Sequence, residues 1–119
     1  MAEMTKDKRI KKEIKILRNE YADIDPKHKM NADRIITRAA YLKATLEDLE
    51  KDLDANGWTE LFQQSEKCDP YERKRPNADL YISLSAQYLR SVKSLDAMLP
   101  KGDNATKNDD LMEFLNDRS

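Results

Sequence analysis

The feature that most constrains the fold is a regular apolar repeat between residues 32 and 53. Successive apolar side chains alternate between steps of three and four, the spacing of a heptad repeat, and only an α-helix brings such positions to one side. The members are Ala32, Ile35, Ala39, Leu42, Leu46, Leu49 and Leu53. We predict one long helix from about Lys27 to Ala55. Asn56-Gly57 should end it, because glycine is the favoured residue at a helix C-cap.

Two further helices are predicted from similar signals. The first runs from about Thr5 to Ala22, with Thr5 as its N-cap, and Asp25-Pro26 ends it because proline disfavours a helical residue before it. The last begins with Pro76 in its first turn and runs to about Leu99. Their apolar stripes are Ile10, Ile14, Leu17, Tyr21 and Ile24 in the first helix, and Leu80, Leu84, Tyr88, Val92, Leu95 and Leu99 in the last.

Together these elements predict an all-α fold. The two long helices form an antiparallel hairpin, and the short N-terminal helix packs near the start of the first of them. Residues 1–26 are then a basic N-terminal helix, residues 27–100 a hairpin oligomerisation core with a connector at 58–75, and residues 101–119 a flexible tail. Two glycines, four prolines and 38% charged residues suit long exposed helices. In the connector, Leu61 and Phe62 either pack locally or form a short strand.

Some apolar residues lie off the predicted stripes and suggest self-association. Ile82 and Leu89 are seven residues apart on another side of the last helix, and Ile36 and Ala40 lie beside the heptad repeat. Exposed apolar surface of this kind marks a partner surface. We therefore predict a homo-oligomer larger than a dimer, with these four residues at its interface.

Enzymatic chemistry finds little support in the sequence. His28 is the only histidine and Cys68 the only cysteine, and two glycines, Gly57 and Gly102, are too few for a phosphate-binding loop. We expect no catalytic residue, no cofactor and no metal site. The longest apolar runs fall far short of the ~20 residues of a membrane span. With its single cysteine, the chain is expected to be cytoplasmic and to have no membrane partner.

Charge is balanced overall at −1 but is unevenly distributed. Residues 1–45 carry 12 Lys and Arg against 7 Asp and Glu, whereas residues 46–70 carry 2 against 8. A rotation of about 100° per residue places one set of basic side chains opposite the apolar stripe of the first helix. The set is Lys8, Lys11, Lys12, Lys15 and Arg18. Such a face suits contact with DNA phosphates, and an ordinary lysine-rich solvent face is the alternative.

A second basic group lies in the connector, just before the last helix. It consists of Arg73, Lys74 and Arg75. These residues are weaker candidates for DNA contact, because exposed charges are common where a helix begins.

The predicted tail ends in a short apolar motif among acidic residues. Residues 101–110 are almost devoid of apolar side chains, and the apolar residues that follow are Leu111, Met112, Phe114 and Leu115. A disordered tether that carries such a motif suits capture by a groove on a partner. The alternative is that the motif docks back on its own chain.

Several segments resemble the small terminase subunits of tailed phages. They are Ala-Ala-Tyr-Leu-Lys-Ala-Thr-Leu-Glu-Asp-Leu at 39–49, Asn56-Gly57, Ser65-Glu-Lys, Pro-Tyr-Glu-Arg-Lys-Arg-Pro-Asn-Ala-Asp-Leu-Tyr at 70–81, and Leu99-Pro100. The resemblance covers somewhat more than half of the chain. It implies a ring-forming, non-catalytic protein of the host cell cytoplasm that binds double-stranded viral DNA and recruits a large terminase subunit, the ATPase and nuclease. The tail motif would contact that large subunit.

One departure from this family concerns DNA recognition. Many small terminase subunits begin with a helix-turn-helix domain, and the ~25 residues before the long helix are too few for three helices. DNA contact would therefore depend on the first helix, the start of the second or the basic connector residues. The competing function is that of a helical adaptor or scaffold that acts only through protein–protein contacts.

Overall fold

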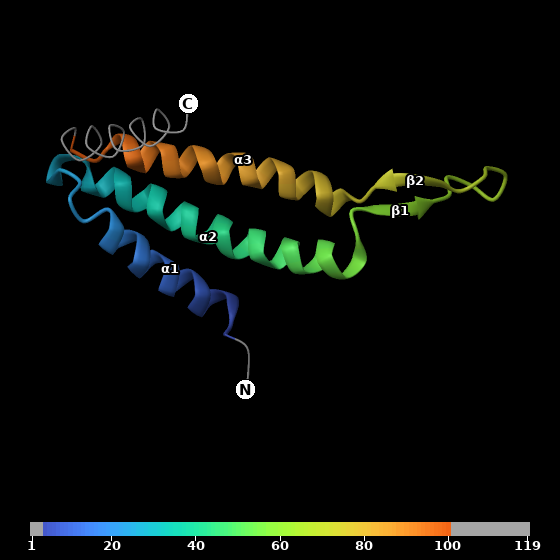
Figure 1. Ribbon diagram of the computed structural model, residues 1–119, viewed down its shortest axis with the longest axis horizontal. Helices are drawn as coiled ribbons and strands as arrows, with labels where there is room; N and C mark the ends of the chain where they lie inside the picture. The colour runs from blue at the N-terminus through green and yellow to red at the C-terminus, as the bar shows by residue number, and fades with distance from the viewer. Residues whose placement is uncertain (1–3, 101–119) are drawn as a thin grey trace, which may run out of the picture.

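The computed structural model describes residues 4–100, which form three helices and one β-hairpin. Helix α1 spans Lys6–Glu20, α2 spans Pro26–Asn56 and α3 spans Pro76–Ala97. Strands β1 (Thr59–Phe62) and β2 (Tyr71–Lys74) lie between α2 and α3. In Figure 1, α2 lies between α1 and α3, and the β-hairpin projects from the end of the helical body where α2 meets α3. The predicted antiparallel pairing of the two long helices is confirmed.

Local capping signals define the helix ends. Thr5 accepts a hydrogen bond from the Lys8 amide at 3.3 Å, and Asp25 accepts one from the Lys27 amide at 3.1 Å. These side chains satisfy amides that the first turn of a helix leaves without partners. Gly57 follows α2 with a φ of 85° and donates its amide to the Leu53 carbonyl at 2.8 Å. The predicted helix starts and ends are therefore correct to within about two residues.

Helix α2 buries two apolar stripes because it has a neighbour on each side. All but one member of the predicted heptad repeat are buried, and Ile35 is partly buried. A second set, Ile36 and Ala40, joins a core cluster with Leu17, Tyr21 and Ile24, which lie in α1 and just after it. Helix α1 therefore packs along α2, where it covers side chains that a two-helix hairpin would leave exposed.

This packing corrects the expected position of Ile36 and Ala40. The sequence predicts both on an outward face that contacts another copy, whereas they are 4% and 0% exposed within a single chain. The physical reason is that α1 packs along α2 well past its start, with Arg18 bonded to Asp33 and Arg9 to Asp48. Neither side chain is available to a second copy.

The core continues to the end of α3. Leu95 is fully buried in the same cluster, and Met98 and Leu99 pack against it. The Tyr21 hydroxyl donates a hydrogen bond to Asp96 Oδ1 at 2.6 Å and so links the end of α1 to the end of α3. Burial, and then the nearby Asp96 carboxylate, raises the pKa of Tyr21 well above its usual value. On α3 the predicted stripe is at least partly buried except for its first member, Leu80, which is exposed.

The connector is a β-hairpin, so the chain is mostly helical and not wholly α. The strands pair antiparallel from Thr59 opposite Lys74 to Phe62 opposite Tyr71. Phe62 and Tyr71 meet edge to face with ring centroids 5.9 Å apart, a favourable cross-strand pair. The Arg73 guanidinium lies 3.6 Å from the centroid of the Phe62 ring. Of the two possibilities for Leu61 and Phe62, the short strand is the one that forms.

Candidate nucleic-acid interface

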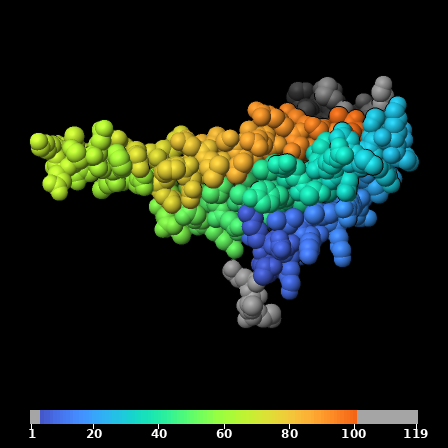
Figure 2. Space-filling view, turned by 180° about the vertical axis from the view of Figure 1, so that it is seen from behind, coloured from blue at the N-terminus to red at the C-terminus, as the bar shows by residue number. Residues whose placement is uncertain are grey.

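Four lysines form an exposed stripe on α1, which we call the lysine stripe: Lys8, Lys11, Lys12 and Lys15. They occupy positions i, i+3, i+4 and i+7, which lie on one side of a helix. Leu17 is buried on the opposite side, which fixes the rotation of the helix. Within residues 4–100, none of the four ammonium groups has an ion pair. Figure 2 shows α1, in blue, at the lower edge of the molecule with side chains projecting away from the body.

Other charged residues of α1 are used to attach the helix to α2. Glu13 accepts a hydrogen bond from Lys43 at 2.9 Å, and Arg9 donates one to Asp48 at 2.6 Å. The Glu13 carboxylate raises the pKa of Lys43 and keeps it charged. These contacts draw Glu13 toward α2 and away from the lysine stripe.

Arg18 differs from the four lysines because it already has an acidic partner. Its guanidinium donates two hydrogen bonds to the Asp33 carboxylate, at 2.8 and 3.1 Å. The hydrogen bond raises the pKa of Arg18 and lowers that of Asp33, so both stay charged. Arg18 therefore links α1 to α2, and its charge is partly neutralised before any DNA arrives.

The same holds for all three basic residues before α3. Arg73 pairs with Glu60 at 2.9 Å, Lys74 with Asp79 at 3.2 Å and Arg75 with Asp52 at 2.8 Å. Glu60 lies directly opposite Arg73 in the β-hairpin register. Each positive charge is matched by a carboxylate, so this group is a poor phosphate-binding surface.

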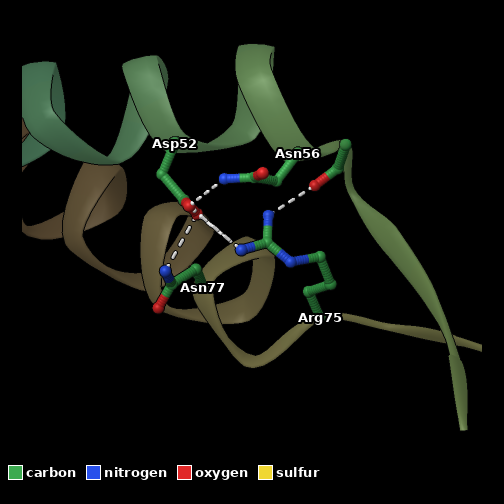
Figure 3. A network of polar contacts seen from close by, with 5 residues as sticks. Asp52, Asn56, Arg75 and Asn77 are labelled. Carbon is green, nitrogen blue, oxygen red and sulfur yellow. Dashed lines mark hydrogen bonds and ion pairs between the residues drawn. The ribbon is translucent and has the colours of Figure 1, made fainter.

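Arg75 belongs to a polar network at the junction of α2 and α3 (Figure 3). It donates to the Gly57 carbonyl at 2.6 Å and to both Asp52 oxygens at 2.8 and 3.1 Å. The amides of Asn77 and Asn56 also donate to Asp52, at 2.9 and 2.8 Å. These hydrogen bonds, with that from Asn77 the strongest influence, lower the pKa of Asp52. The network connects the end of α2 to the start of α3, so the role of Arg75 is structural.

Exposed apolar residues lie on several different elements, among them α3, α2 and the β-hairpin. Ile82 and Leu89 are 52% and 59% exposed on α3, as their predicted positions require, and their role in an interface stays a prediction. The tail motif Leu111, Met112, Phe114 and Leu115 lies outside the described residues. Met30 on α2 and Leu61 on the β-hairpin are even more exposed, at 73% and 75%, and the sequence patterns did not single out either as a surface residue.

Met30 lies in a groove along α2 that was also not predicted. Two hollows of about 680 and 650 Å³ meet at Asp33 and Arg34. The first is lined by apolar side chains from the end of α1, the following turn and the start of α2; the second continues along α2. Their lining includes Tyr21, Ile24, Met30 and Ile36, with Lys29, Arg34, Arg38 and Tyr41 at the sides. We call this feature the α1–α2 groove. The spacing of Met30, Arg34 and Arg38 in steps of four could have indicated a shared face.

His28 and Cys68 lie in different elements of the described part of the chain. His28 lies in the first turn of α2, whereas Cys68 is exposed in the loop between the strands, where it accepts a hydrogen bond from Ser65 at 3.4 Å. Among residues 4–100, no three histidine, cysteine or acidic side chains are grouped so that they could hold a metal ion. The helices of this same segment include none with the length and apolar character needed to cross a membrane.

Comparison of the chain with protein-family models, with curated proteins and with solved structures gave no significant match.

Proposed function

We propose that the chain binds double-stranded DNA through the lysine stripe and acts as a phage small terminase subunit. In this role it binds viral DNA and recruits a large terminase subunit during genome packaging. The observation that carries the DNA part is the lysine stripe itself, four exposed lysines that form no ion pair within residues 4–100. The terminase part depends on the sequence resemblance alone.

The dimensions of the lysine stripe suit a DNA backbone. Seven residues of α-helix separate Lys8 from Lys15, which is about 10 Å along the helix axis. That length corresponds to roughly three base-pair steps of duplex. Lysine ammonium groups contact phosphates as point charges and do not distinguish bases. The stripe therefore supports binding that depends on salt and has little sequence preference.

A four-lysine variant tests this proposal. Changing Lys8, Lys11, Lys12 and Lys15 to Ala should weaken duplex binding and reduce the dependence of the affinity on salt. The plot of log K against log salt has a negative slope, and each lost phosphate contact should make that slope shallower by about 0.9. Fluorescence anisotropy with a labelled duplex at several salt concentrations measures both quantities. Circular dichroism should show unchanged helix content, because all four side chains are exposed.

A matched control removes the same number of positive charges elsewhere. Lys67, Lys74, Arg90 and Lys93 are exposed in the β-hairpin and on α3. When these four residues are changed to Ala, the slope of log K against log salt should stay closer to that of the unaltered chain than the slope of the four-lysine variant does. Equal losses in the two variants would show that only total charge matters, and the proposed interface would then be wrong.

The second candidate function is a helical adaptor that acts only through protein contacts. The observation that favours it is the exposure of Ile82 and Leu89, together with the pairing of every cation in the group Arg73–Arg75. An adaptor should show no duplex binding at low salt even with its lysines intact. Co-purification with a large terminase subunit, measured on the same preparation, separates the terminase role from simple DNA binding.

A further inference from the structure

The α1–α2 groove is lined by apolar side chains and basic ones, together with the ion pair of Arg18 with Asp33. Ile24 and Ile36 are almost completely buried beneath it, while Met30 is 73% exposed. Lys29, Arg34 and Arg38 are exposed beside these apolar side chains. Within residues 4–100, none of these three cations has an ion pair. Such a groove is suited to an apolar segment that also carries negative charge.

The chain itself contains a segment of this composition. Residues 109–117 contain four apolar side chains, and the acidic ones among them are Asp109, Asp110, Glu113 and Asp117. Leu111 and Leu115 are four residues apart, a spacing that places both on one side of a helical turn. The segment and the groove are therefore complementary in both charge and apolar character.

The connection between them is short enough for the two to meet within one chain. Met98 and Leu99 pack against the core cluster that contains Ile24, so the last described residue, Pro100, is at the same end of the molecule as the groove. Figure 1 shows the end of α3 beside the start of α2. Eight intervening residues, 101–108, span at most about 26–29 Å. The groove follows α2 from Lys29 to Tyr41, about 18 Å of helix, which is less than the span of the tether.

We propose that residues 109–117 dock in the α1–α2 groove of the same chain, with their acidic side chains at Lys29, Arg34 and Arg38. The same-chain arrangement is favoured because a short tether gives an effective concentration in the millimolar range, far above that of a second copy at micromolar protein. The docked segment is shielded, so a partner that captures Leu111 to Leu115 has to displace it. This inference does not rest on DNA binding by the lysine stripe.

Disulfide cross-linking in the full chain tests the docking. In a background with Cys68→Ser, one variant carries Met30→Cys and Phe114→Cys. The control carries Ser94→Cys and Phe114→Cys. Met30 and Ser94 are both exposed, so neither substitution should disturb the core, and Ser94 lies near the end of α3, close to the start of the same tether. Under mild oxidation at low micromolar protein, the Met30–Phe114 pair should form an intrachain disulfide at least tenfold faster than the control pair. Mass spectrometry after digestion identifies the bond.

Two additional measurements test whether the segment in the groove belongs to the same chain and whether charge contributes to its docking. Tenfold dilution should leave the intrachain rate unchanged, whereas a rate that falls with dilution and yields covalent dimers would overturn the same-chain arrangement. Adding Arg34→Glu and Arg38→Glu should slow the reaction severalfold, and Asp110→Lys with Glu113→Lys should restore it. Equal rates for the Met30 and Ser94 pairs would overturn docking altogether.

Discussion

At the scale of single residues, Asp52 is an acidic side chain with three hydrogen-bonding partners. It accepts hydrogen bonds from Asn56 one turn later and from Arg75 and Asn77 across the junction with α3. Hydrogen bonds to the charged form of a carboxyl favour that form. The ionised carboxylate of Asp52 therefore stabilises the join between α2 and α3.

This arrangement predicts a specific dependence of stability on pH. The pKa of Asp52 is lower in the folded chain than in the unfolded one, so its contribution is complete above about pH 4 and is lost as the pH falls through the folded value. Asp52→Asn should lower the melting temperature by a few degrees at pH 7, and the difference from the unaltered chain should shrink toward pH 2.

Thermal melts followed by circular dichroism across this pH range make the comparison. Asp54→Asn is the matched control, because Asp54 lies on the same helix and is exposed. It should change the melting temperature little at either pH. A difference between Asp52→Asn and the unaltered chain that stays constant from pH 7 to pH 2 would argue against the charged carboxylate as the cause.

At the scale of secondary-structure elements, the helix ends are set by short local signals, and for this reason they were predictable. Thr5, Asp25, Pro26 and Gly57 act within a few residues of their position in the sequence. The β-hairpin lacked such a signal. Its strands are four residues each, and the residues that join them, 63–70, do not form the two-residue turn that marks a hairpin most clearly. The sequence therefore left a strand open as one of two possibilities.

Gly57 provides a prediction at this scale. Its φ of 85° and ψ of 173° lie in a region that is essentially restricted to glycine. An added Cβ would approach only the Thr59 carbonyl, at 4.0 Å, so the strain of Gly57→Ala comes from the backbone and not from a clash. We expect a loss of about 1–3 kcal/mol in the free energy of unfolding.

Chemical denaturation measures this loss. Asn56→Ala is the matched control, because Asn56 ends the same helix and its side chain makes an exposed hydrogen bond to Asp52. The control should cost less than Gly57→Ala. If Gly57→Ala proves neutral, the backbone at the end of α2 adopts a conformation other than the one described.

The candidate interface was predictable in part because the position of a side chain around a helix also follows from local sequence spacing. Helical rotation, once anchored by the apolar stripe of α1, places Lys8, Lys11, Lys12 and Lys15 correctly on the exposed face. It could not reveal that Arg18 and Arg75 are already paired, because Asp33 and Asp52 are 15 and 23 residues away along the chain. The heptad repeat likewise shows which side chains are buried but not which neighbour buries them. Ile36 and Ala40 lie beside the repeat, and their burial depends on contacts with Leu17, Tyr21 and Ile24, which are distant in the sequence, so the sequence assigned both to an outward surface.

At the scale of the whole molecule, α2 organises the structure because α1 and α3 both pack against it. The remaining candidate surface for self-association is the outer side of α3, where Ile82 and Leu89 are exposed. Changing both to Lys should reduce the mass of the predicted oligomer and leave the helix content unchanged. Multi-angle light scattering and circular dichroism measure the two properties.

Two control variants make this experiment specific. Ser83→Lys with Ser94→Lys adds the same charge to exposed positions of α3 without removing apolar surface and should preserve the oligomer. Ile36→Lys should instead unfold the chain, since it buries an unpaired ammonium in the core. A mass of 13.9 kDa for the unaltered chain at all micromolar concentrations would show that the predicted homo-oligomer is wrong.

The projecting β-hairpin has a consequence for how the protein moves through solution. The molecule measures 64 × 44 × 31 Å, and its radius of gyration is 19.8 Å. A compact domain of this length would have a radius of gyration of about 13–14 Å. An elongated particle diffuses and tumbles more slowly than a sphere of equal mass. A single copy should therefore leave a gel-filtration column early, at the volume of a globular standard about two to three times heavier, and its elution volume alone would mimic a small oligomer.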